Sequence, residues 1–170
     1  MNFWDFCSPV YDFAQKRNVN YEKWNSLLVD EVELNSTVLE IAGGTGEISI
    51  RASYKASHVI CTDLSEKMLK VARKKTKGIS NINFEKADIY DLKYKDKQFD
   101  IVIASQVLHL LDDTQKAVDE IKRVCKEKVI LPVCLLENIK GIAKFQVGLW
   151  RILGFNPKYT FNQDSYISFL

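Results

Sequence analysis

The sequence lacks several features that would indicate other classes of protein. It has no run of about 18 apolar residues, the length that a membrane-spanning helix requires. Its net charge of +2 is too small to indicate a polyanionic partner such as a nucleic acid. The start, MNFWDFCSPVYDF, lacks the basic end and the continuous apolar stretch of a signal peptide, so we expect a cytoplasmic protein.

Cysteine and histidine are scarce, and their spacing does not indicate a metal site. The four cysteines are widely spaced and contain no C-x-x-C pair, which favours buried reduced thiols over a disulfide or a metal centre. These cysteines are Cys7, Cys61, Cys125 and Cys134. The two histidines, His58 and His109, have no ligand-like neighbours at suitable spacing, so we expect no metal.

The chain does have enough apolar residues for one folded domain. With 170 residues, 46% of them hydrophobic, it can form a single core, and we find no repeat or low-complexity segment. Strand-like and helix-like segments alternate over residues 37–136, which indicates an α/β domain. The aromatic-rich residues 1–36 precede this core and contain a predicted helix from Tyr21 that covers one face of the sheet. Its residues at helical spacing are Trp24, Leu27, Leu28 and Glu31 to Val32.

The segment Thr37–Ile48, TVLEIAGGTGEI, is the most informative part of the chain. Its aliphatic residues Val38, Leu39 and Ile41 predict a strand buried on both faces, with Glu40 near the strand end. Small residues follow at once, and they allow a sharp turn and a close approach of a ligand to the backbone. They are Ala42, Gly43, Gly44 and Gly46. We therefore predict a cofactor-binding turn.

Two classes of cofactor use such a turn. The dinucleotide pattern is G-x-G-x-x-G, and here Ser49 stands at the position of the third glycine. Glu47 would also place a negative charge at the helix start, where a pyrophosphate has to lie. A cofactor that carries a cationic ammonium and a sulfonium is better matched by Glu40 and Glu47.

The turn resembles the first motif of the class I S-adenosylmethionine (SAM) dependent methyltransferases, acid-x-G-x-G-x-G. Glu40 corresponds to the acid, and Gly44 and Gly46 correspond to the last two glycines. Ala42 stands where the family usually has its first glycine, and a methyl group is tolerable there if the local φ is negative. Asp63 ends the next predicted strand, about twenty residues past the turn, where nucleoside-binding α/β folds bind a ribose diol. Both cofactor classes share that acid, so Asp63 indicates a nucleoside without identifying it.

Later segments follow the order of the same family. The resemblance implies that Leu64 and Met68 flank the adenine, although ordinary core packing is the alternative for Met68. It also implies that Asp88 accepts a hydrogen bond from the exocyclic amine while the backbone of Ile89 contacts the ring edge. The strand Gln98–Ser105 matches the F-D-x-V signature, and we count Ser105, at its end, among the cofactor-binding residues.

Nucleic-acid substrates are disfavoured by two observations. The strand ending at Ser105 is not followed by the N-P-P-Y or D-P-P-Y clamp that methylation of base amines usually needs. The basic residues after Ser65 lie on the polar side of an amphipathic helix pattern, with no stacking aromatics between them. We therefore expect a small-molecule acceptor and no nucleic-acid partner.

The acceptor side is less clearly marked. Tyr11 resembles the tyrosine that many small-molecule methyltransferases place over the methionine end of SAM, and the alternative is that the N-terminal aromatics only cap the core. His109 is the one group near the site that could take a proton at neutral pH, and the alternative is a histidine that holds its own loop in place. We expect the acceptor pocket to combine Tyr11, the loop after Ser105 and the aromatic tail around Phe145 and Trp150.

The resemblance implies a three-layer α/β/α Rossmann-like fold with a mostly parallel sheet, in a group of small-molecule methyltransferases that includes quinone-biosynthesis enzymes. Members of this group end in an antiparallel strand pair, which is missing here. After a predicted fifth strand, Lys128–Leu136, residues 137–170 have a helical pattern. We expect either self-association through this strand edge or the tail, or a chain that is part of a longer one.

The predicted function is transfer of a methyl group from SAM to a small-molecule acceptor by in-line displacement, with S-adenosylhomocysteine as the product. One alternative is a SAM-binding module without catalysis. A nicotinamide-dependent (NAD) oxidoreductase is less favoured because the third glycine is missing.

Overall fold

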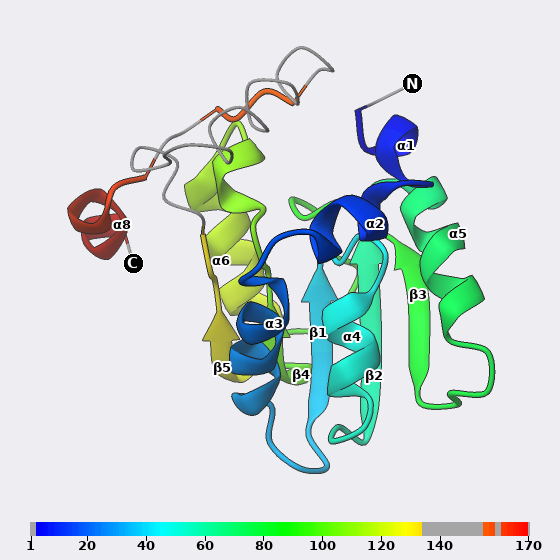
Figure 1. Ribbon diagram of the computed structural model, residues 1–170. Helices are drawn as coiled ribbons and strands as arrows, with labels where there is room; N and C mark the ends of the chain where they lie inside the picture. Colours follow the sequence, from blue (N-terminus) through cyan, green and yellow to red (C-terminus); the bar gives the residue numbers. More distant parts are fainter. Residues whose placement is uncertain (1–2, 134–154, 159–160, 170) are drawn as a thin grey trace.

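The computed structural model describes residues 3–133, 155–158 and 161–169 (Figure 1). Its centre is a sheet of five strands in the order β3-β2-β1-β4-β5. All four strand pairs are parallel. The strands are β1 Thr37–Ile41, β2 His58–Asp63, β3 Ile82–Lys86, β4 Phe99–Ile103 and β5 Cys125–Ile130. The predicted Rossmann-like α/β/α fold with a mostly parallel sheet is confirmed.

Helices cover both faces of this sheet. Helices α3 and α4 pack on one face, and α6 packs against β4 and β5 on the other (Figure 1). The helical segments are α1 Phe3–Cys7, α2 Tyr11–Lys16, α3 Tyr21–Asp30, α4 Glu47–Ala52, α5 Glu66–Lys75, the 3-10 helix η1 Leu108–Leu110, α6 Thr114–Val124 and α8 Gln163–Phe169. No helix in the described ranges is long and apolar enough to cross a lipid bilayer.

The central strand β1 shows why this sheet forms. Successive side chains of a strand point to opposite faces, so Val38 joins the apolar cluster under α3 and α4 while Leu39 joins the cluster under α6. Leu39 pairs with Ile60 of β2 on one side and with Val102 of β4 on the other. The β-branched and aliphatic residues are thus buried on both faces, as the sequence predicted.

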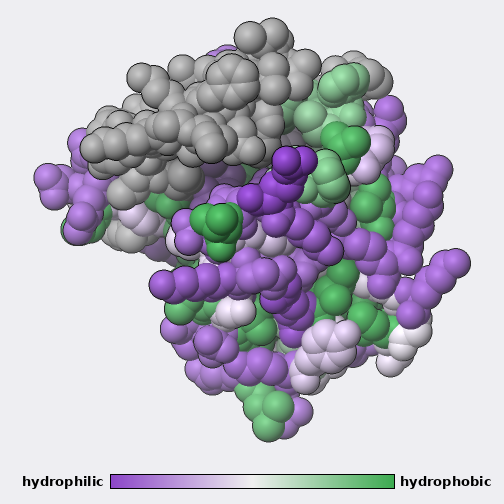
Figure 2. All heavy atoms as spheres, in the orientation of Figure 1, coloured by the Kyte–Doolittle hydropathy of each residue, from purple (hydrophilic) through white to green (hydrophobic). Residues whose placement is uncertain are grey.

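Most apolar residues of the core lie inside these two clusters. On the face shown in Figure 2, hydrophilic residues cover most of the described surface, and the hydrophobic residues form smaller separate patches. Three cysteines, Cys7, Cys61 and Cys125, are free thiols. Cys134 lies outside the described residues.

The predicted inner face of the helix from Tyr21 is partly wrong. Leu28 and Val32 are buried, but Trp24 and Leu27 are 36% and 53% exposed. Asn25 takes the inward position on α3 instead, one helical turn before Leu28. The apolar residues of this short helix lie on more than one side, so their spacing alone did not determine which side faces the sheet.

The fifth strand also differs from its prediction. It spans Cys125–Ile130 and so begins directly after α6. At the other end of α6, Asp113 caps the helix N-terminus, and its side chain accepts from the Lys116 N–H. β5 lies at the sheet edge and carries charged residues at 126–128, which hinder pairing between strand edges. Self-association through this edge stays a prediction.

The C-terminal part is described only in segments. Residues 155–158 and 161–169 contain the helix α8 and no strand, whereas the helical pattern around Phe145 and Trp150 falls on residues outside the description. Phe161, just before α8, is buried in the core cluster, and α8 packs on that cluster through Tyr166 and Phe169. The Tyr166 hydroxyl donates to the carbonyl of Leu131.

Candidate functional site

A cavity of about 330 Å³ lies where the first four strands end. Most of the predicted site residues line it, namely Tyr11, Ala42, Gly44, Asp63, Leu64, Met68, Asp88, Ile89 and Ser105. They are far apart in the sequence, but the carboxyl ends of parallel strands lie along one edge of a sheet and bring them together. The volume falls in the range of small-molecule pockets.

The turn after β1 has an unusual backbone. Ala42, Gly44 and Gly46 have φ angles of +55°, +57° and +74°. The condition under which a methyl group would be tolerable here, a negative φ, is therefore not met at Ala42. The turn needs the left-handed conformation at this position, which costs a residue with a Cβ about 1–2 kcal/mol. A Cβ on Gly44 would meet no heavy atom within 4 Å, so the space above this backbone is open.

Gly43 is needed for packing. A Cβ placed on it would lie 2.5 Å from Sγ of Cys61 and 2.9 Å from Cδ of Glu40. Gly43 is not among the residues that line the cavity, and neither is Gly46, which is the N-cap residue of α4. These two glycines form the underside of the turn.

Glu40 lies beneath the turn and is only 2% exposed. Its Oε2 accepts hydrogen bonds from the Ser49 N–H at 2.9 Å and from the Ser49 hydroxyl. Burial raises the pKa of Glu40 to about 7, although the hydrogen bonds from Ser49 act in the opposite direction. The carboxylate thus ties the strand end to the first turn of α4, and it is not among the cavity-lining residues.

Asp63 forms part of the cavity wall at the end of β2. Its Oδ2 accepts from the Gly44 N–H at 2.8 Å, and its Oδ1 accepts from the Ser65 N–H at 2.7 Å. Burial raises the pKa of this carboxyl, and the backbone hydrogen bonds partly offset that effect. A carboxylate has about four acceptor sites, so Asp63 can accept from a ligand hydroxyl while it holds the glycine turn.

The N-terminal helices are tied to the core beside the cavity. The Ser65 hydroxyl donates to Asp5 of α1 at 2.6 Å. Asp12 of α2 accepts from the Thr45 hydroxyl and, at 2.8 Å, from Lys75 of α5. Both helices are short, so these polar contacts supply much of what fixes them in place.

Two aromatic residues of this N-terminal segment line the cavity, Trp4 and Tyr11. Their ring centroids lie 6.3 Å apart at an interplanar angle of 75°, and Trp4 also contacts Phe155 from the C-terminal part. Burial raises the pKa of Tyr11 to about 12, so its hydroxyl stays protonated at neutral pH. Tyr11 therefore lines the cavity, and its place over the methionine end of SAM stays a prediction.

His109 lies in η1 and is not brought to the cavity, although its neighbours Leu110 and Leu111 line it. The imidazole is 4% exposed and packs against Phe155, with ring centroids 6.0 Å apart. Burial lowers its pKa, and Nδ1 has no hydrogen-bond partner in the described structure. The described residues also contain no group of three or more His, Cys, Asp or Glu side chains placed to hold a metal.

The sequence indicated the loop after Ser105 as part of the acceptor pocket but did not indicate which of its residues line the cavity, and Gln106 is the most informative of them. It follows β4, has a φ of +57°, and donates its N–H to the Pro132 carbonyl at 2.9 Å. Tyr90 and Asp112 also line the cavity. The only available signal was their position shortly after the ends of β3 and β4, which does not show which side chain turns inward.

Comparison with known proteins gives the family. Residues 39–132, more than half of the chain, match the model described as "Methyltransferase domain". The chain belongs to this methyltransferase family. The matched region begins within β1, contains β2 to β5 and includes almost the whole cavity wall, so the family match and the geometry concern the same part of the chain.

Individual relatives agree with this assignment. The methyltransferase-family chain is 37% identical over 113 residues to a demethylmenaquinone methyltransferase of Leptospira interrogans, covering 61% of this chain and 45% of that protein. It is 31% identical over 156 residues to the enzyme of the same name from Staphylococcus carnosus, covering 82% and 64%. It thus spans less than two thirds of the length of either relative.

A solved structure shares the fold at lower identity. A SAM-dependent methyltransferase from Aquifex aeolicus superposes with a TM-score of 0.60 at 23% identity, covering 78% of this chain and 79% of that one. Since the identity is low, this likeness concerns the fold alone.

Proposed function

We propose that this methyltransferase-family chain binds SAM in the cavity and transfers its methyl group to a small-molecule acceptor by in-line displacement, releasing S-adenosylhomocysteine. The observation that carries the proposal is Asp63, whose carboxylate lines the cavity while it accepts from the Gly44 N–H at 2.8 Å. An acid directly beside an open glycine turn supports binding of a ribose diol at this position.

The residues present fit such a cofactor. The open space above Gly44, which a Cβ would enter without meeting any atom, allows close approach of a ligand to the backbone. Met68 is buried and Leu64 exposed, and both line the cavity beyond Asp63. We assign Asp88 and Ile89 to the adenine end and Tyr11 to the methionine end. A positive ligand group above the turn would stabilise the ionised form of Glu40 and lower its pKa.

SAM supplies an activated methyl group when it is bound, so the chain mainly has to align the reactants and exclude water. Trp4 and Tyr11 cover the cavity from the N-terminal side, and Leu110 and Leu111 close it near η1. Water exclusion follows from these apolar walls. Nothing in the proposal depends on His109, because its ring packs against Phe155.

The acceptor side of the cavity combines apolar and polar groups. Trp4 and Leu111 offer apolar surface, whereas Gln106 and Ser105 offer hydrogen bonds. We infer a small, partly apolar acceptor. The names of the two Leptospira and Staphylococcus relatives, which specify demethylmenaquinone, support an acceptor of this class.

Binding of SAM, S-adenosylhomocysteine and NAD to the purified chain by isothermal titration calorimetry tests the proposal. We expect binding of the first two and none of NAD. NAD binding without S-adenosylhomocysteine binding would contradict it. Formation of S-adenosylhomocysteine with a hydroquinone or phenol acceptor would then separate an enzyme from a binding module without catalysis.

A further inference from the structure

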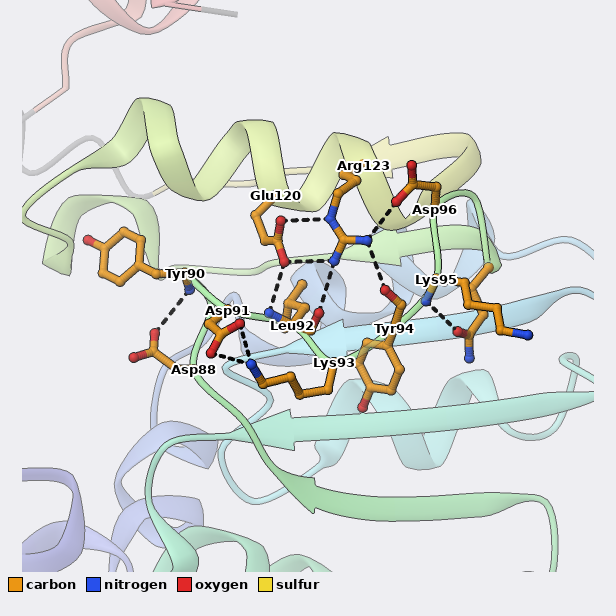
Figure 3. A network of polar contacts seen from close by, with 11 residues as sticks. Asp88, Tyr90, Asp91, Leu92, Lys93, Tyr94, Lys95, Asp96, Glu120 and Arg123 are labelled. Carbon is orange, nitrogen blue, oxygen red and sulfur yellow. Dashed lines mark hydrogen bonds and ion pairs between the residues drawn. The ribbon is translucent and has the colours of Figure 1, made fainter.

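The wall of the cavity between β3 and β4 has little strand structure of its own. β3 ends at Lys86 and β4 begins at Phe99, and residues 87–90 between them line the cavity. Figure 3 shows that the rest of this connection runs beside α6, where Glu120 and Arg123 project toward it. The position of this wall therefore depends on side chains of α6.

Arg123 uses all of its N–H groups in this contact. Its Nε and Nη2 donate to the two carboxylate oxygens of Glu120, both at 2.8 Å. Nη2 also donates to the Leu92 carbonyl at 2.9 Å. Nη1 donates to the Tyr94 carbonyl and to Asp96, both at 2.8 Å. A guanidinium has five N–H donors in a rigid plane, and here every one is paired.

Glu120 completes the contact from the same helix. Its Oε1 accepts from the Leu92 N–H at 2.9 Å, so the N–H and the carbonyl of Leu92 are both held by the Glu120–Arg123 pair. The pKa of Glu120 is lowered, mainly by its hydrogen bonds from Arg123. Leu92 itself is buried in the core cluster under α6. Leu92 is thereby held at its N–H, at its carbonyl and at its side chain.

Leu92 is linked to the cavity wall by a tight turn. The Asp91 N–H donates to the Asp88 carbonyl at 3.1 Å, and the Tyr90 N–H donates to the Asp88 carboxylate at 3.0 Å. The Tyr90 hydroxyl accepts from the N–H of Asp113, the N-cap residue of α6, at 3.0 Å. A shift of Leu92 would therefore move the carboxylate and the backbone that line the cavity.

We propose that Glu120 and Arg123 are positioning residues for the cofactor, which hold residues 88–92 in the conformation that recognises an adenine ring. The inference rests on the proposed function, because it assumes that SAM occupies the cavity with its adenine beside Asp88. Neither side chain lines that cavity, so both act through the backbone of Leu92. Lysine at position 123 would keep the charge but not the fork of donors, which makes it the informative replacement.

The experiment compares Arg123→Lys with a matched control, Arg73→Lys. Arg73 of α5 also pairs with an acid and a backbone carbonyl, at 2.5 Å and 3.0 Å, and its side chain is 43% exposed against 32% for Arg123. Neither partner of Arg73 lines the cavity. The Kd of S-adenosylhomocysteine and of S-inosylhomocysteine, in which a keto group replaces the amine, is measured by calorimetry, and Tm is measured in parallel.

We expect Arg123→Lys to weaken S-adenosylhomocysteine binding about tenfold and to reduce the preference over the inosine analogue. Arg73→Lys should leave both quantities within about twofold of the unmodified protein. Its fall in Tm should be smaller than that of Arg123→Lys, because Arg73 makes two of these contacts and Arg123 makes five. Glu120→Gln keeps an acceptor for the Leu92 N–H, so it should change the Kd and the base preference less, in the same direction. It replaces Arg123→Lys as the test variant if Arg123→Lys does not fold.

Two results would overturn the inference. Unchanged affinity and unchanged base preference in Arg123→Lys and Glu120→Gln would show that α6 only stabilises the fold. Absence of S-adenosylhomocysteine binding by the unmodified protein would overturn the proposed function, and this inference with it. The two failures are distinguished because the unmodified protein is measured first.

Discussion

Replacing Ala42 with glycine is expected to stabilise the protein. Ala42 has a φ of +55°. The left-handed conformation destabilises an alanine by about 1–2 kcal/mol, whereas glycine adopts it without this strain. Glycine also gives the unfolded chain more conformational freedom, which lowers the free energy of unfolding by about 0.4–1 kcal/mol. The difference predicts a gain of about 0.5–1 kcal/mol in the free energy of unfolding.

Urea unfolding without ligand measures this gain, provided that the m-value does not change. The matched control is Gly44→Ala in the same turn. Gly44 has a φ of +57°, and a Cβ there would meet no heavy atom within 4 Å, so the substitution adds backbone strain and no clash. The same two opposing effects are expected to lower the free energy of unfolding by about 0.5–1 kcal/mol. The two variants should therefore move in opposite directions.

A loss of stability in Ala42→Gly alongside a loss in Gly44→Ala would refute the reasoning, because it would mean that the backbone strain at Ala42 is worth less than the packing of its methyl group on the core cluster. Ala42 also lines the cavity, so removing its methyl group should leave the affinity for S-adenosylhomocysteine equal or higher. A clear fall in affinity would show that this methyl group contributes to the site.

Three other substitutions test the site. Asp63→Asn removes a charge that holds the Gly44 N–H, and should raise the Kd of S-adenosylhomocysteine about tenfold or more by calorimetry; an unchanged Kd would place the ribose elsewhere. The raised pKa of Glu40, about 7 against 4.5 unfolded, predicts stability that is fully present below pH 4.5 and lost as pH rises through 7. The free energy of unfolding, measured with urea, should fall by at most about 3 kcal/mol over this pH range because of Glu40. Glu40→Gln should remove this contribution to the pH dependence. An identical pH profile in both proteins would contradict the prediction. Gly43→Ala places a Cβ 2.5 Å from Sγ of Cys61 and should lower the free energy of unfolding by about 1–3 kcal/mol; a stability equal to that of the unmodified protein would show that the turn can move away.

Much of the fold follows from local patterns. The apolar run Val38–Ile41 was expected to form a strand buried on both faces, and it is the central strand of the sheet. The position of Asp63 directly after an aliphatic run placed it at a strand end, where it lines the cavity. These features are local because strand propensity, burial and turn chemistry are properties of a few adjacent residues.

The boundaries of elements were less well predicted, and the reason is tertiary. β5 was expected at Lys128–Leu136 from its aliphatic residues, yet it begins at Cys125, which pairs with Phe99 of β4. The charged residues at its start would not indicate a strand by themselves. Pairing with a neighbouring strand extends it there, and that partner lies far away in the sequence.

The sequence by itself determined the order of strands and helices, the position of the glycine turn and the acids that follow the strands. Only the tertiary structure decided which way each side chain points: Ala42 takes a positive φ, Glu40 lies beneath the turn, His109 packs on Phe155 and Arg123 reaches Leu92. The physical reason is distance along the chain. Spacing within one segment determines its conformation, whereas the orientation of a side chain depends on contacts with residues from other elements, which no local pattern contains.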